Sequence, residues 1–225
     1  MPTHTNRRGV IATIAALAAT GLTARAQTAG ESSEETAAPE SDGGGGEQTS
    51  ADYPTGDIAL GDEDAPLTVY EYASLTCPHC ATFHMNTWPE VKREYVDTGK
   101  VRFILREVYF DQYGLWASMV ARCGGERGFY PMVEAFLEQQ SAWTQAQDIG
   151  EAIQQIGRRA GLSSSRLAEC LSDREYAKAL LESYQENREA HDIQSTPTFI
   201  IDGEKHTGDM SFEEFSALLD DALAS

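Results

Sequence analysis

Residues 67–84 read LTVYEYASLTCPHCATFH, and they carry the clearest structural signals of the chain. Its first part, residues 67–73, is apolar and rich in β-favouring side chains, which predicts a buried strand. After Cys80 the apolar residues recur at roughly helical spacing, which predicts a helix. Cys77 and Cys80 therefore lie where a strand ends and a helix begins, and this is the usual arrangement of a redox-active Cys-x-x-Cys pair.

The start of a helix favours a thiolate at Cys77. Backbone N–H groups of the first turn have no partner within the helix, and this end of the helix dipole is positive, so the pKa of a cysteine placed there falls. We expect the Cys77 sulfur to be exposed and to attack, and Cys80 to be shielded and to resolve the mixed disulfide. Pro78 suits the first helical position, and His79 can add a positive charge near the Cys77 sulfur. Because a stabilised thiolate stabilises the reduced form, the pair is expected to be an oxidant.

Three other uses of such a cysteine pair fit the sequence less well. A structural zinc site needs four ligands, but Cys123 and Cys170 stand alone; His84 could be a third ligand, and no fourth stands out. Covalent haem attachment needs a histidine after the second cysteine, where this chain has Ala81. An inert structural disulfide remains an alternative. The prediction is a redox pair without a metal site.

Residues 1–26 have the pattern of an export signal. Arg7 and Arg8 form a charged start, residues 9–22 form an Ala-rich apolar run, and small residues ending at Ala26 fit a cleavage site. The apolar run is shorter than the ~20 residues that a membrane span needs, so an anchor is the weaker interpretation. The paired arginines leave the export route open.

Residues 27–56 are expected to be a disordered, acidic linker rich in Gly and Ser. Residues 43–46 are all glycine, and no apolar side chain larger than Ala occurs between residues 28 and 52. Such a segment cannot bury enough surface to offset the entropy lost on ordering. The remaining part, residues 57–225, is long enough for one domain with a proper core.

The charge of the chain excludes some partners. The sequence has 17 Lys and Arg against 36 Asp and Glu, for a net charge of −19. Without the three arginines of the expected signal, 14 basic residues remain and the net charge is −22. So acidic a protein is not expected to bind nucleic acid or anionic lipid, and its charge favours solubility.

Three further patterns complete an α/β domain. Residues 101–108 alternate as a second core strand, and with the preceding helix, in which Pro89 should make a kink or a break, they form a β-α-β unit with parallel strands. From about residue 113 to 191 there is no strand signal, which predicts an inserted helical subdomain. Residues 198–202 return to a strand, and Ser211 starts a final capped helix.

Cys123 and Cys170 both fall in the predicted helical insertion. In an exported chain with four cysteines, two of them already assigned, the other two are expected to form a structural disulfide. Two buried free thiols are the alternative.

Thr196 and Pro197 directly precede the returning strand, where a proline can be cis. Together with Cys-Pro-His-Cys and the helical insertion, Thr196-Pro197-Thr198-Phe199 resembles the DsbA-like branch of the thioredoxin superfamily, over essentially all of residues 57–224. The resemblance implies a thioredoxin-like fold with an inserted helical subdomain. It also implies that Pro197 is cis and lies against the redox pair, and that Thr196 presents its backbone to a bound substrate strand.

The resemblance also implies a function. We expect an exported, periplasmic thiol:disulfide oxidoreductase that introduces disulfides into reduced, folding proteins. It would need no diffusible cofactor and would be re-oxidised by a quinone-linked membrane protein of the DsbB type. A reductase or isomerase, and a non-catalytic thioredoxin-fold binding module or chaperone, are the alternatives. A monomer is expected, because residues 27–56 offer no apolar seam for pairing. His191 and His206 are interpreted as surface residues without a role.

Overall fold

The computed structural model describes residues 53–225. The export signal expected at residues 1–26 and the linker as far as residue 52 lie outside this part. Within residues 53–225, no helix is both long enough and apolar enough to cross a membrane.

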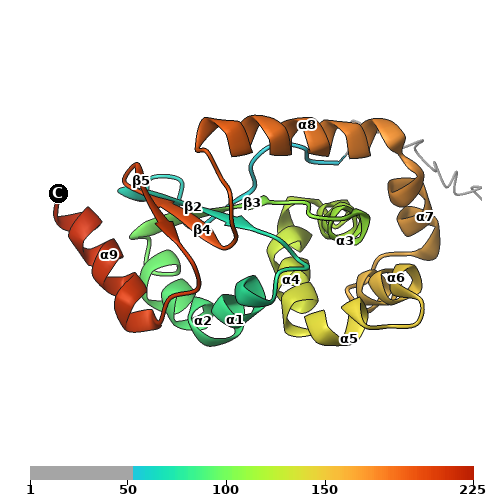
Figure 1. Ribbon diagram of the computed structural model, residues 1–225, viewed down its shortest axis with the longest axis horizontal. Coiled ribbons are helices and arrows are strands. Elements are labelled where there is room, and N and C mark those ends of the chain that lie inside the picture. Colours follow the sequence, from blue (N-terminus) through green and yellow to red (C-terminus); the bar gives the residue numbers. More distant parts are fainter. Residues whose placement is uncertain (1–52) are drawn as a thin grey trace, which may run out of the picture. The chain divides into compact units, whose positions relative to one another are not determined.

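The core of the domain is a five-stranded sheet in the order β1-β3-β2-β4-β5 (Figure 1). The central strand is β2 (Leu67–Ala73), which pairs in parallel with β3 (Val101–Glu107) and antiparallel with β4 (Thr198–Ile201). The edges are β5 (Glu204–Thr207) and β1 (Ala59–Leu60), both antiparallel to their neighbours. The predicted β-α-β unit is confirmed, whereas β1 was not predicted because two residues carry no alternation.

The connection from β2 to β3 is helical but broken. It consists of α1 (Pro78–Asn86), α2 (Trp88–Val91) and a π-helical turn η2 (Lys92–Val96). The break falls at Thr87, just before Pro89, because a proline has no N–H to continue the hydrogen-bond ladder. The predicted interruption by Pro89 is therefore confirmed.

The predicted insertion is entirely helical. The start of a helix leaves backbone N–H groups without a partner. Four helices of the insertion begin at an Asp or Ser whose side chain accepts one of these N–H groups. In Figure 1, α8 lies on one side of the sheet, and α1 and α2 lie on the other. The remaining helices are α3 (Gln112–Cys123), α4 (Gly125–Glu138), α5 (Gln140–Thr144), α6 (Ile149–Arg159), α7 (Ser164–Ser172), α8 (Arg174–Ala190) and α9 (Phe212–Ala224).

An aromatic cluster fastens α1 and α9 to the sheet. Phe83 of α1 lies 4.7 Å from Phe199 of β4 and 5.2 Å from Phe215 of α9, measured between ring centroids. All three side chains are fully buried. The capping box predicted for α9 is present, with Ser211 and Glu214 exchanging hydrogen bonds. The packing of these three rings therefore fixes the position of α1, the helix that carries Cys80, against β4 and α9.

The folded part begins earlier than expected. Tyr53 is only 5% exposed, and its ring lies 4.9 Å from that of Tyr176. The carbonyl oxygens of Pro54 and Gly56 accept hydrogen bonds from Arg122, at 3.0 and 2.8 Å. The prediction that the disordered linker continues to residue 56 is therefore wrong for its last four residues. Their composition is linker-like, but a buried guanidinium elsewhere in the chain orders them.

Candidate redox site

The two cysteines occupy the first turn of α1. Cys77 is the N-cap residue, in an extended conformation, and Pro78 opens the helix as expected. The approach to the helix is held from two sides: the Cys77 N–H donates to the carbonyl of Ser74 at 3.1 Å, and the Gln140 side chain donates to the carbonyls of Leu75 and Cys77, each at 2.9 Å. These contacts fix the position of the Cys77 backbone before any substrate arrives.

The cysteines are less exposed than the sequence indicated. Both are free thiols; Cys80 is fully buried, as expected, but Cys77 is only 9% exposed. The prediction of an exposed Cys77 is therefore wrong, because the loop that carries Thr196 and Pro197 covers the sulfur. The Cys77 Sγ donates to the Thr196 carbonyl oxygen at 3.4 Å, and the Thr196–Pro197 peptide bond is cis, as the resemblance implied.

The two thiols have opposite acidities. The pKa of Cys77 falls from 9.0 to about 5, chiefly through the hydrogen bond that the Cys80 side chain gives it. Burial opposes this fall, while the Thr196 side chain and the backbone N–H groups of Cys80 and His79 add to it. The pKa of Cys80 is raised far above its ordinary value, first by burial, then by its bond to Cys77 and by the negative charge of Glu71. At neutral pH the reduced pair is a Cys77 thiolate beside a Cys80 thiol.

His79 faces solvent and a carboxylate. Its side chain is 71% exposed, and Nδ1 lies 3.1 Å from Oδ1 of Asp209 in the loop before α9. The effect of His79 on the Cys77 pKa comes through its backbone N–H. Asp209 is therefore a neighbour of the site that the sequence did not indicate. No local sequence pattern connects it with His79.

A buried ionisable pair lies beneath Cys80. Glu71, on the central strand, is fully buried, and its Oε2 lies 2.8 Å from Nε2 of His84 on α1. Sequence reasoning proposed His84 only as a third zinc ligand, and the structure pairs it with Glu71 instead. The available signal was the glutamate itself, because a charged residue inside a buried strand is costly unless it is paired. Within residues 53–225 no group of three or more His, Cys, Asp or Glu is placed to hold a metal ion.

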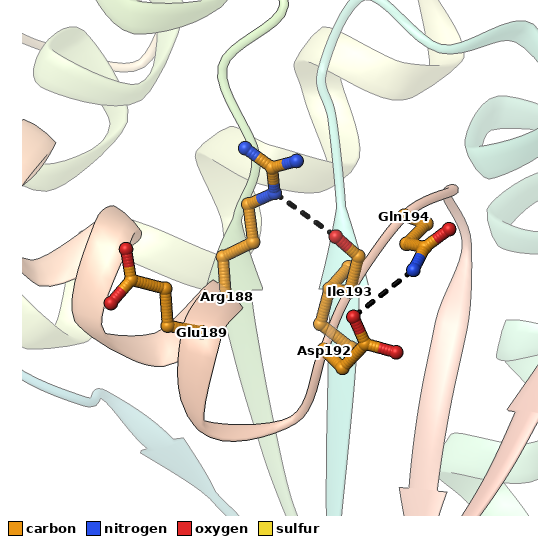
Figure 2. A pocket seen from close by; sticks show the side chains of 5 residues that line it. All are labelled: Arg188, Glu189, Asp192, Ile193 and Gln194. Atoms are coloured by element: carbon orange, nitrogen blue, oxygen red, sulfur yellow. Dashed lines mark hydrogen bonds between the residues drawn. The ribbon is translucent and has the colours of Figure 1, made fainter.

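The loop in front of Thr196 is anchored to the end of α8. Figure 2 shows that Arg188 points over the turn, where its Nε donates to the carbonyl of Ile193 at 3.0 Å. The Gln194 side chain donates to Asp192 at 3.0 Å. These residues and Glu189 line a pocket of about 590 Å³ that contains neither cysteine. The contacts position the loop that covers Cys77, and we assign the pocket no chemistry.

Two other predictions concern residues away from the thiols. Cys123 and Cys170 are joined in a disulfide, as predicted, with Cα atoms 6.3 Å apart. His191 is not a free surface residue: it is half-buried, and its Nδ1 lies 2.7 Å from the Tyr72 hydroxyl. The hydroxyl of Tyr72 also receives a hydrogen bond from Arg106, so His191 helps to fasten the end of α8 to the sheet.

Comparison with known proteins agrees with this geometry. A family model described as thioredoxin matches residues 54–221. The chain belongs to the thioredoxin family. Within this family it is DsbA-like: the solved structure of Wolbachia pipientis alpha-DsbA1 is 28% identical, superposes with a TM-score of 0.70, and the match covers 75% of this chain and 91% of that one.

Two relatives of this thioredoxin-family chain have names that refer to disulfide chemistry. A protein from Rickettsia bellii, assigned by its name to the protein-disulfide oxidoreductases, is 33% identical over 168 residues, which are 74% of this chain and 64% of that protein. The chain thus spans less than two thirds of this relative. Disulfide bond formation protein D of Bacillus subtilis is 24% identical, over 75% of this chain and 78% of that protein.

Proposed function

We propose that this protein is an exported thiol:disulfide oxidoreductase that introduces disulfides into reduced, folding proteins through Cys77 and Cys80. The observation that carries the proposal is the opposed acidity of the two thiols, with the pKa of Cys77 lowered to about 5 and that of Cys80 raised. A stable Cys77 thiolate stabilises the reduced form, so the oxidised form readily gives up its disulfide.

Turnover follows from the placement of the two sulfurs. A substrate thiolate attacks Cys77, the Cys77–Cys80 bond breaks, and the electron pair goes to Cys80, which takes up a proton. A second substrate thiolate then attacks the substrate sulfur of the mixed disulfide, and Cys77 leaves as a stable thiolate. The Thr196 carbonyl lies 3.4 Å from the Cys77 sulfur, and this proximity supports the proposal that the Thr196 backbone would contact a bound substrate.

Cellular location and partners belong to the same proposal. The pattern of residues 1–26 supports export to the periplasm, and the DsbA-like relationship supports re-oxidation by a quinone-linked membrane thiol oxidase of the DsbB type. The substrates would be reduced or unfolded exported proteins, and no diffusible cofactor takes part in the exchange.

The direction of the reaction is tested by the reduction potential against glutathione. An oxidase should have a potential well above the ~−270 mV of thioredoxin, oxidise a reduced model peptide readily and reduce insulin slowly. The Cys77→Ser variant should lose peptide oxidation, whereas the Cys123→Ala/Cys170→Ala variant serves as a control that keeps it. A potential near that of thioredoxin with rapid insulin reduction would identify a reductase, and efficient rescue of scrambled disulfides would identify an isomerase.

A further inference from the structure

A small pocket lies beside the residue that precedes Cys77, and neither thiol lines it. The pocket has a volume of about 230 Å³. Pockets for drug-sized ligands usually measure about 300–1,000 Å³, so this one suits a single long side chain. Its lining residues come from the turn before Cys77, from the start of α3, from α5 and from the start of α6: Thr76, Asp111, Tyr113, Trp143, Thr144 and Ile149.

Contacts within the fold hold this pocket next to the reactive cysteine. The helix α5 supplies two of the lining residues and also carries Gln140, whose side chain donates to the Cys77 carbonyl at 2.9 Å. The helix α3 approaches the same turn closely at Gly114, where an added Cβ would lie 3.6 Å from the Thr76 hydroxyl oxygen. The pocket is therefore fixed within one or two residues of the sulfur that a substrate would attack.

The polar groups of the pocket are mainly hydrogen-bond acceptors. Asp111 is the one charged residue among those that line it, and it is exposed. Its Oδ1 accepts the N–H groups of Tyr113 and Gly114 at 2.8 and 2.9 Å, whereas within residues 53–225 its Oδ2 makes no hydrogen bond or ion pair. The Thr144 hydroxyl already donates to the Gln140 carbonyl at 2.7 Å, so it can only accept from a ligand.

The remaining wall of the pocket is apolar. Tyr113, Trp143 and Ile149 supply it, and Tyr113 and Ile149 are each half-buried. Lysine and arginine lay their aliphatic stems along such surfaces while their charged ends reach a polar partner, and an aromatic ring attracts a cation further. An acidic side chain would instead meet the like charge of Asp111. The pocket therefore matches a basic side chain in both shape and charge.

We propose that this pocket is a substrate subsite, which takes the side chain of a lysine or arginine close in sequence to the reactive cysteine of the substrate. The inference rests on the proposed oxidase function and names a substrate class for it: reduced proteins whose cysteine has a basic neighbour. Residues of an extended chain are about 3.3 Å apart. A side chain one or two positions from a cysteine bonded to Cys77 can therefore reach the pocket beside Thr76.

The test uses pairs of dithiol peptides that differ only in arginine or citrulline, placed before the first cysteine in one pair and after it in the other. Citrulline has nearly the shape of arginine but no charge. The measured quantity is the ratio of the kcat/KM values for oxidation of the two peptides by the oxidised protein. In at least one pair, Asp111→Asn should lower this ratio at least about fivefold relative to the parent, which corresponds to about 1 kcal/mol.

A matched control separates the subsite from the general effect of charge. Asparagine is as good an N-cap as aspartate, so Asp111→Asn keeps the start of α3 while it removes the negative charge. Asp148→Asn removes the same charge from the cap of α6, where Asp148 accepts the Glu151 N–H at 2.9 Å outside the pocket. This control should keep the arginine-to-citrulline ratio of the parent. The effect of arginine on the peptide's own thiols cancels, because every variant meets the same peptides.

The outcomes distinguish failure of the subsite from failure of the proposed function. If the parent oxidises none of the peptides, the oxidase function is wrong. If folded Asp111→Asn keeps the ratio of the parent in both pairs, or if Asp148→Asn lowers it as much, the subsite is overturned. If Asp111→Asn does not fold, Thr144→Lys decides, because it leaves Asp111 in place and puts a cation into the pocket: a similar fall in the ratio supports the subsite, and an unchanged ratio overturns it.

Discussion

The hydrogen bond from Cys80 should set the acidity of Cys77, and the comparison of Cys80→Ser with Cys80→Ala tests this. The Cys80 side chain is the largest cause of the fall in the Cys77 pKa to about 5. A serine at position 80 retains a side-chain hydrogen-bond donor one bond beyond Cβ, so Cys77 should still titrate well below the free-cysteine value of about 8.5. An alanine removes the donor, so the pKa of Cys77 should rise toward that value.

The lowered pKa of Cys77 should also contribute to the free energy of unfolding of the reduced protein. Neutral pH lies about two pH units above the native Cys77 pKa, and each unit corresponds to about 1.4 kcal/mol, so the thiolate should stabilise the reduced fold by up to about 3 kcal/mol. Since the folded-state pKa is depressed, this stability is fully present above the unfolded-state pKa of about 9 and is lost as the pH falls through about 5.

Two measurements check this reasoning. The ultraviolet absorbance of the thiolate gives the pKa of Cys77 in each variant, and urea unfolding of the reduced protein at pH 5 and pH 8 gives the stability. Subtracting the same pH difference measured for Cys77→Ser removes the contribution of all other titrating groups. A Cys80→Ala variant that titrates as low as Cys80→Ser would refute the role of the Cys80 donor and leave the backbone N–H groups as the cause.

Three further predictions concern stability. The Cys123→Ala/Cys170→Ala variant should lose up to about 4 kcal/mol of unfolding free energy, because the bond closes a loop of 47 residues, yet keep peptide oxidation; loss of oxidation in the folded variant would contradict this. Arg122→Met should cost about 3–5 kcal/mol by leaving Glu107 buried without its partner, measured by urea unfolding, and a loss below about 1 kcal/mol would contradict it. Tyr130→Phe should cost about 1–3 kcal/mol in the same assay, since its hydroxyl accepts from the Leu105 N–H and lies within donating distance of the Ile58 and Phe103 carbonyls; an unchanged midpoint would show that these contacts contribute nothing.

Local patterns were sufficient for most of the fold. The strand at residues 67–73 and the helix after it each carry their own periodicity, and the capping box at Ser211 is complete within four residues. Elements that depend on distant partners were missed. Residues 53–56 look like linker until Arg122, more than sixty positions later, binds their carbonyls, and β1 is too short to alternate.

The same division holds for the site. The cysteine motif and Thr196-Pro197 could be predicted from the sequence because the residues of each motif are adjacent in the chain. The Glu71–His84 pair joins a strand to a helix, and the contact between His79 and Asp209 spans 130 positions, so neither could be found by reading neighbours. The burial of Cys77 was also missed, since it depends on how closely the Thr196 loop approaches the helix start.

A spacing of three residues places the two sulfurs in different surroundings, and this has a consequence for turnover. Cys77 caps the helix and faces the Thr196 loop, whereas Cys80 lies one turn inside with no exposed surface. A substrate thiolate can therefore reach only Cys77, and Cys80 must always be the leaving group. Because the pKa of Cys80 is raised by burial and by Glu71, that leaving sulfur must be protonated inside the protein.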